Sequence, residues 1–111
     1  MLEKTRRIGP ALGRVLLWRL ITALGIDAFH TILGMPFKMS LESAFRSVGS
    51  LGVFSLGRAY EAGLTALPRF LKPGDTSIDC GANQGIYALL MASLVGEQGH
   101  VIAIEPQPYS A

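Results

Sequence analysis

The sequence has a single cysteine, Cys80, among its 111 residues. One cysteine excludes a disulfide within the chain, and it excludes a zinc site built from several cysteines. The two histidines, His30 and His100, have no partner at ligand spacing, so we expect no metal site. A chain with so few thiols suits a reducing compartment, and we expect a cytoplasmic protein.

The sequence also lacks an apolar run that reads as a membrane span. The stretch 12–34 is strongly apolar, but Arg14, Arg19 and Asp27 interrupt it, whereas a spanning helix needs about 20 predominantly apolar residues. Arg19 also breaks the apolar core of a signal peptide, and no clear cleavage site follows. We favour a helix that packs on a domain, with an interfacial membrane helix as the alternative.

Charge is scarce and unevenly distributed. Only 16% of the residues are charged. Residues 1–58 carry eight Lys or Arg against three acids, a balance of +5, and residues 59–111 carry two against five, a balance of −3. The front half could lean on an anionic surface, through residues 1–34 if a membrane is involved. The back half offers no basic patch for phosphates, so we expect no nucleic-acid partner.

The front part of the chain predicts helical and irregular structure. Residues 1–10 suggest a loose basic arm, and 11–33 has apolar residues at helical spacing, with Gly25 as a point where the helix could split. Short strands are expected at 37–41 and 53–56. We expect residues 1–58 to be a mainly helical extension.

The back part, 59–111, is expected to be a separate and incomplete domain. Its first segment, Tyr60 to Leu71, predicts a helix with Glu61 in its first turn and a bend at Pro68. The segments that follow are a turn at 72–75, a strand at 76–80, a tight loop at 81–85, a helix at 86–95, a turn at 96–99 and a strand at 100–104. The last strand is mostly apolar, so we expect it to be buried on both faces.

Strand, loop, helix and strand predict a βαβ unit with parallel strands. Their carboxyl ends then share one edge, where Asp79 and Glu105 meet and where ligands of open α/β sheets bind. Gly81 allows a sharp turn and a close ligand, and Gly85 allows the helix to start close to the strand. Free N–H groups at the helix start suit a carboxylate. Glu105 offers two acceptor oxygens for the hydroxyls of a ribose and disfavours a ribose phosphate.

Plainer interpretations exist for several of these residues. Asp79 could cap the loop that follows it, and Glu105 could be a solvated strand end. Cys80 is expected to be a small buried hydrophobe, because no basic partner that would activate it is near in the sequence. Trp18 and Phe29 are expected to pack in a core.

The segment Asp79-Cys80-Gly81-Ala82-Asn83-Gln84-Gly85 resembles the first motif of class I S-adenosylmethionine-dependent methyltransferases. Three further segments make it similar to the FkbM family in particular: Tyr60-Glu61 and Leu71-Lys72-Pro73-Gly74-Asp75 before the motif, and Glu105-Pro106-Gln107-Pro108 after it. Four segments in order and at the right spacing are more specific than a glycine loop alone. The resemblance covers residues 60–108, less than half of the chain.

The resemblance implies an α/β fold: a partial Rossmann-like class I methyltransferase fold, here its first βαβ unit. It implies S-adenosyl-L-methionine as the cofactor. Gly81, Ala82, Asn83 and Gly85 would line its methionine end, Asp79 would support the loop, and Glu105 would hold the ribose hydroxyls. Many class I members have glycine where this sequence has Asn83, although FkbM-like members often have asparagine.

The activity implied is methyl transfer, to oxygen in the FkbM type, with a small-molecule or glycan acceptor that the sequence does not identify. The catalytic residues of the family lie after Glu105, so we expect a truncated cofactor-binding front end that is inactive alone. Two alternatives stay open. One is a nicotinamide-binding Rossmann fragment, although the loop lacks the middle glycine of Gly-x-Gly-x-x-Gly. The other is a non-enzymatic stub that binds a membrane or a partner.

Overall fold

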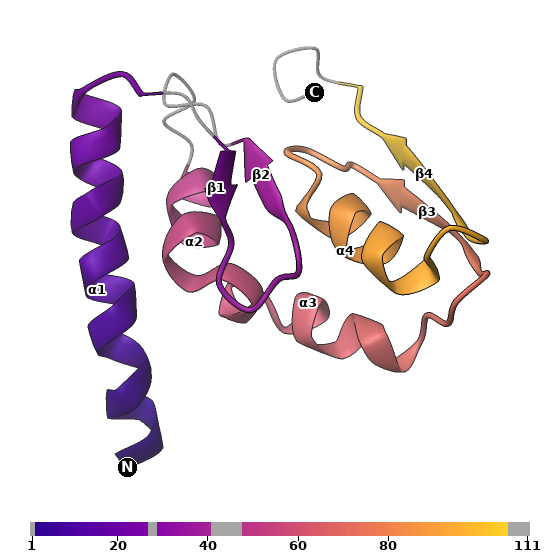
Figure 1. The fold of residues 1–111 in the computed structure, drawn as a ribbon, viewed down its shortest axis with the longest axis horizontal. Helices are drawn as coiled ribbons and strands as arrows, with labels where there is room; N and C mark the ends of the chain where they lie inside the picture. Colours follow the sequence, from indigo (N-terminus) through magenta and orange to yellow (C-terminus); the bar gives the residue numbers. More distant parts are fainter. Residues whose placement is uncertain (1, 27–28, 41–47, 107–111) are drawn as a thin grey trace. The chain divides into compact units, whose positions relative to one another are not determined.

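The computed structural model describes residues 2–26, 29–40 and 48–106. The helices and strands, in chain order, are α1 (Leu2–Ala23), β1 (Phe29–Thr31), β2 (Lys38–Ser40), α2 (Val48–Leu56), α3 (Ala62–Ala66), β3 (Thr76–Cys80), α4 (Ile86–Val95) and β4 (His100–Ile104) (Figure 1). Two short 3-10 turns, Gly57–Ala59 and Leu67–Arg69, flank α3. Contacts divide the chain into two compact units, 1–60 and 61–111.

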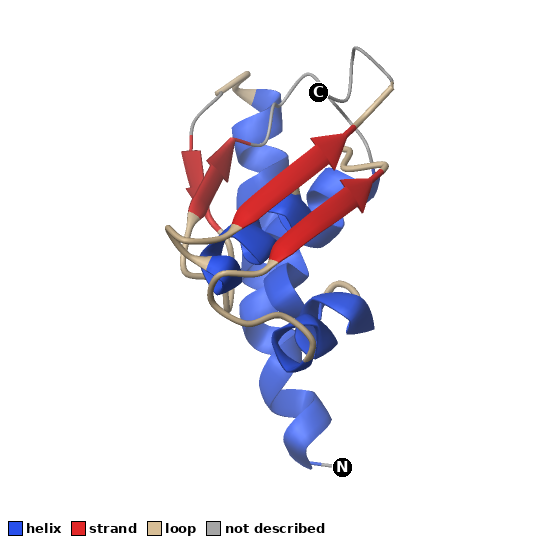
Figure 2. Ribbon diagram, turned by 90° about the vertical axis from the view of Figure 1, so that its right-hand side faces the viewer, coloured by secondary structure: helices blue, strands red, loops and turns tan. Residues whose placement is uncertain are grey.

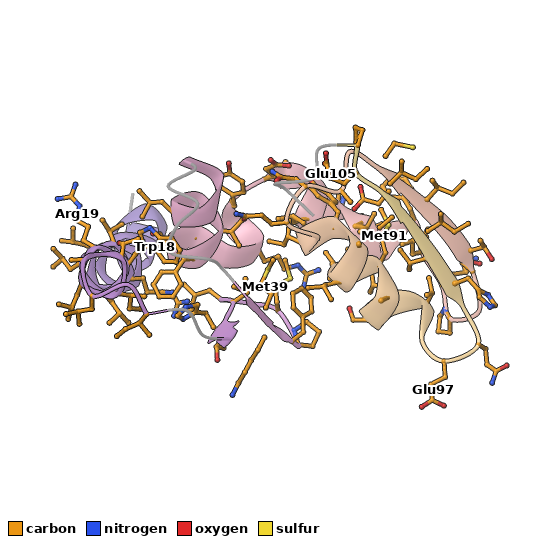
Figure 3. All side chains as sticks on the ribbon, turned by 90° about the horizontal axis from the view of Figure 1, so that it is seen from above. Trp18, Arg19, Met39, Met91, Glu97 and Glu105 are labelled. Carbon is orange, nitrogen blue, oxygen red and sulfur yellow. The ribbon has the colours of Figure 1, made fainter. Side chains whose placement is uncertain are left out.

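The first unit is built on α1, which packs against α2. The indole of Trp18 is buried and lies 5.2 Å from the Phe54 ring and 6.2 Å from the His30 ring, centroid to centroid. Figure 3 shows Trp18 pointing from α1 towards α2, whereas Arg19 points away. The expectation that Trp18 packs in a core is confirmed; the side chain of Phe29 lies outside the described part of the chain.

Arg14 ties α1 to two other elements of the first unit. Its Nη2 donates a hydrogen bond of 2.6 Å to the carbonyl oxygen of Thr31 in β1. Its Nε donates to the carbonyl oxygen of Phe54 in α2, and its guanidinium lies 4.1 Å above the Phe54 ring. Strands β1 and β2 form an antiparallel hairpin, with His30 opposite Met39. The side chain of Arg14 therefore connects α1 both to α2 and to this hairpin.

The other face of α1 is apolar and exposed. Leu12, Leu16, Leu17 and Leu20 of α1 are all solvent-exposed, and so is Leu24, directly after the helix. Within the described residues, no helix has the length and apolarity needed to cross a membrane. The expected packing of this helix on a domain therefore explains the face with Trp18 and does not explain the exposed leucines.

Several expectations for the first unit are wrong. Residues 2–10 belong to α1 and are not a loose arm, because the helix continues through Gly9-Pro10. The helix ends at Ala23, and Gly25 adopts φ +64, a left-handed turn that leads into the hairpin. Residues 53–56, expected as a strand, lie in α2, where Val53 and Phe54 are buried. Burial against α1 suits a helix there, and an apolar run so short does not distinguish helix from strand.

The second unit contains the expected βαβ arrangement. Strands β3 and β4 pair in parallel, with Thr76 opposite His100 and Cys80 opposite Ile104, and Figure 2 shows the two arrows side by side. Helix α4 connects them and covers one face of the pair. The bounds of all three elements agree with those predicted from the sequence. The segment before them is interrupted: α3 is short, and Pro68 lies in the first residues of the 3-10 turn that follows.

The face of β3 and β4 opposite α4 is open, which corrects two expectations. Strand β4 is not buried on both faces, since Ile102 and Ile104 are about half exposed, as is Ile78 of β3. Cys80 is likewise exposed and not a buried hydrophobe. The physical reason is the strand period of two, which places Cys80 on the face opposite Asp79. Only one face of each strand is covered by α4.

Candidate functional site

The loop between β3 and α4 has the backbone of a sharp, left-handed turn. Gly81 has φ +81, Gly85 has φ +88, and Asn83 between them has φ +49. Among the described residues, Asn83 is the one residue other than glycine that has a positive φ. Asparagine tolerates this region better than most residues do. The departure from the common glycine at this position therefore has a conformational explanation.

Backbone hydrogen bonds hold this loop over the end of β4. The N–H groups of Gly81 and Ala82 both donate to the carbonyl oxygen of Ile104, at 2.8 and 3.0 Å. The N–H of Asn83 donates to Oε2 of Glu105 at 2.8 Å. The sequence predicted the position of Glu105 at the end of the strand. It did not predict that the Glu105 carboxylate would accept a hydrogen bond from the loop.

Asp79 lies beneath the loop and is buried, with 8% of its surface exposed. Its Oδ2 is shielded from solvent and has no hydrogen-bond partner among the residues that the structure describes. A buried carboxylate oxygen without a donor is costly. A hydrogen-bond donor from a ligand would therefore be bound favourably at this oxygen. Capping of the following loop, the plainer interpretation of Asp79, would not leave Oδ2 without a partner.

The start of α4 differs in one respect from the expectation. Gly85 is the N-cap of α4 and makes no side-chain capping bond. A Cβ built at Gly81 or Gly85 would meet no atom within 4 Å, so Gly85 is favoured by its positive φ and not by close packing of helix on strand. Both glycines leave the backbone of the loop approachable, as a bound ligand requires.

A second polar contact joins α4 to the segment before the strand. The Tyr87 hydroxyl donates a hydrogen bond of 2.6 Å to Oε2 of Glu61, the N-cap residue of α3. Desolvation, this bond and the negative charges of Glu61 and Asp79 together raise the pKa of Tyr87 to about 12. Sequence reasoning placed Glu61 in a helical first turn and gave Tyr87 no role, since 26 residues separate them.

The Tyr87 hydroxyl fits because Gly63 has no side chain. A Cβ at Gly63 would lie 2.5 Å from the hydroxyl oxygen and 3.3 Å from Cζ. Gly63 therefore supports the bond between Tyr87 and Glu61 by leaving room for it.

The arrangement offers both acceptors and N–H donors for a polar ligand. The loop of Gly81, Ala82, Asn83 and Gly85 lies between the buried Asp79 and the half-buried Glu105, as parallel strands predict. Carboxylates can accept hydrogen bonds from ammonium and hydroxyl groups, and the helix start can donate to a carboxylate. The residues present thus fit an amino acid joined to a ribose; their assignment as cofactor contacts stays a prediction.

The chain is similar to a ribosomal RNA large subunit methyltransferase E from Hahella chejuensis, with 37% identity over 68 residues. The match covers 61% of this chain and 29% of the relative, so the chain spans less than a third of that protein's length. No protein-family model and no solved structure matches the chain. The similarity supports a methyltransferase in general, and it does not distinguish the FkbM family.

Proposed function

We propose that the unit from Glu61 onwards binds S-adenosyl-L-methionine as part of a class I methyltransferase of the FkbM type. The observation that carries the proposal is the glycine loop bonded to the Glu105 carboxylate, with Oδ2 of Asp79 buried beneath it and without a partner among the described residues. The similarity to a methyltransferase independently supports methyl transfer in general, and the FkbM type rests on the resemblance of the motifs. When bound, the cofactor supplies a methyl group activated on a sulfonium.

Each residue has a defined part in the proposal. Gly81, Ala82, Asn83 and Gly85 form the wall against the methionine end. Asp79 accepts a hydrogen bond from it, directly or through water. One oxygen of Glu105 keeps its bond to the loop while the carboxylate accepts from the ribose hydroxyls. The proposal assigns cofactor binding and gives no residue the part of general base.

The acceptor is proposed to be the oxygen of a small molecule or a glycan, as the FkbM resemblance implies. RNA is the alternative, because the relative is named for ribosomal RNA. The acidic balance of residues 59–111 argues against a phosphate-rich acceptor in this unit. Filter binding of the full chain to RNA tests this point: affinity that falls steeply with added salt would favour RNA.

Calorimetric titration of the full chain with S-adenosylhomocysteine and with NAD tests the cofactor. We expect saturable binding of S-adenosylhomocysteine and none of NAD. Glu105→Gln retains an acceptor for the N–H of Asn83 but loses the charge, so binding should weaken about tenfold. Glu97→Gln, an exposed acid in the turn after α4, is the matched control and should bind as the wild type does.

Two results would contradict the proposal. Binding of NAD without binding of S-adenosylhomocysteine would favour the nicotinamide alternative. Equal affinities of wild type and Glu105→Gln would remove Glu105 from the site.

A further inference from the structure

Glu61 and Tyr87 form a contact that the cofactor assignment above does not use. Tyr87 is the second residue of α4, two positions after the glycine loop, and its hydroxyl donates to Oε2 of Glu61 at 2.6 Å. The exposed Glu61 carboxylate is therefore bonded to the first turn of α4, although Glu61 precedes Asp79, the first residue of the motif, by 18 positions. Its Oε1 is a second acceptor at the same place.

The negative charge of Asp79 also acts at this point. Asp79 lies in β3, and the short loop 81–85 connects that strand to the first turn of α4, where Tyr87 lies. Its negative charge adds to burial and to Glu61 in raising the pKa of Tyr87. Asp79 is more than nine-tenths buried, and its Oδ2 has no partner within the described ranges. A carboxylate oxygen that accepts no hydrogen bond favours a charged donor such as an ammonium group as its partner.

We propose that Glu61 and Asp79 together bind the ammonium group of the cofactor's amino-acid end, and that Tyr87 is a positioning residue that orients Glu61. The inference rests on the proposed function, and it adds a binding residue that lies outside the glycine-loop motif. Because the pKa of Tyr87 is raised, its hydroxyl remains a donor to Oε2 of Glu61 throughout the neutral range, and Oε1 of Glu61 is left to accept from the ligand.

A purely structural contact between α3 and α4 is the competing interpretation, and two ligands separate the two. S-adenosylhomocysteine carries the amino-acid end, whereas 5′-methylthioadenosine has the same ribose and adenine without it. If Glu61 binds the ammonium group, its loss should affect the first ligand alone. If the contact only stabilises the unit, both ligands should lose affinity together.

The experiment is a calorimetric titration of the full-length chain with both ligands. Glu61→Gln should weaken S-adenosylhomocysteine about tenfold, the loss expected for one hydrogen bond to a charged group. Tyr87→Phe, which removes only the hydroxyl, should weaken it severalfold. Both variants should bind 5′-methylthioadenosine within about twofold of the wild type, and Glu97→Gln should leave both affinities unchanged.

The possible results distinguish this inference from the function beneath it. Wild-type binding of S-adenosylhomocysteine that Glu61→Gln and Tyr87→Phe leave intact would overturn the inference and keep the proposed function. Equal losses for both ligands would assign the contact to stability alone. A wild type that binds neither ligand would overturn the proposed function and this inference with it.

Discussion

Asn83 and Glu105 are joined by a hydrogen bond of 2.8 Å from a backbone N–H to a carboxylate oxygen. The bond links the loop after β3 to the residue after β4, across 22 positions of the sequence. It holds Asn83 at φ +49, in the left-handed region. The conformation of the loop and the place of the acid are therefore coupled.

This coupling predicts how substitutions at Asn83 behave. Asn83→Gly should change the free energy of unfolding by less than about 0.5 kcal/mol, because glycine adopts positive φ without strain. Asn83→Val should cost about 1–2 kcal/mol, since a β-branched residue is disfavoured there. Urea denaturation of the two variants checks the prediction. Equal stability of the glycine and valine variants would show that the loop does not hold this conformation.

Gly63 is predicted to be sensitive only while Tyr87 keeps its hydroxyl. Gly63→Ala places a Cβ 2.5 Å from that oxygen, and the overpacking should cost about 1–3 kcal/mol. In a Tyr87→Phe background the nearest remaining contact is 3.3 Å. The same change should then be neutral or stabilising, because alanine favours a helix over glycine by about 1 kcal/mol.

A double-mutant cycle measured by thermal or urea unfolding tests this change of sign. The wild type, both single variants and the double variant are compared under one condition. Additive effects would mean that Gly63 and Tyr87 are not in contact.

Tyr87 is predicted to titrate late. Its pKa of about 12 in the folded chain lies above the ordinary 10.0, so folding favours the neutral phenol. This contribution to stability is complete below pH 10 and is lost as the pH rises towards 12. The tyrosinate absorbance of the wild type minus that of Tyr87→Phe should therefore rise near pH 12. A difference spectrum with its midpoint at the ordinary value would contradict the contact with Glu61.

His30 is predicted to make the first unit sensitive to acid. Burial, and then the positive charge of Arg14, lower the pKa of His30 below its ordinary 6.5. The neutral ring is favoured in the folded chain, so its contribution is complete above pH 6.5 and is lost as the pH falls towards the lowered pKa. The melting temperature should accordingly decrease over this range.

The matched variant for this prediction is His30→Phe, which retains a ring against Phe54, 5.3 Å away in the wild type, and has no proton to gain. It should remove most of the decrease in melting temperature. The exposed His100 serves as the control, through His100→Asn. An unchanged pH profile in His30→Phe would assign the acid sensitivity to other groups.

The sequence predicted the βαβ unit because its signals are local and agree with one another. Turn residues mark the ends of both strands, Thr76–Cys80 and His100–Ile104. The apolar spacing of the segment between them fits a helix and does not fit a strand. The front half was predicted less well because its structure depends on distant contacts. Arg14 bonds to Thr31 and Phe54, and no local pattern indicates that 53–56 would be helical.

The candidate site also has a part that local signals predicted and a part that depends on distant contacts. The order of strand, loop and strand was enough to place Asp79 and Glu105 at one edge, as the parallel register bears out. The contact between Glu61 and Tyr87 was beyond sequence reasoning, because it depends on how α3 meets α4 and on the space left by Gly63. The resemblance singled out Glu61 as part of the pair Tyr60-Glu61, but it did not connect that residue with Tyr87.

Cys80 stands exposed on the open face of the sheet, opposite Ile104 in the register. Because it is the chain's single thiol, a maleimide dye would label one defined position, without any engineered cysteine. A molecule seated over Ile78, Ile102 and Ile104 would slow that labelling. The protein thus carries its own chemical reporter for whether this apolar face is covered.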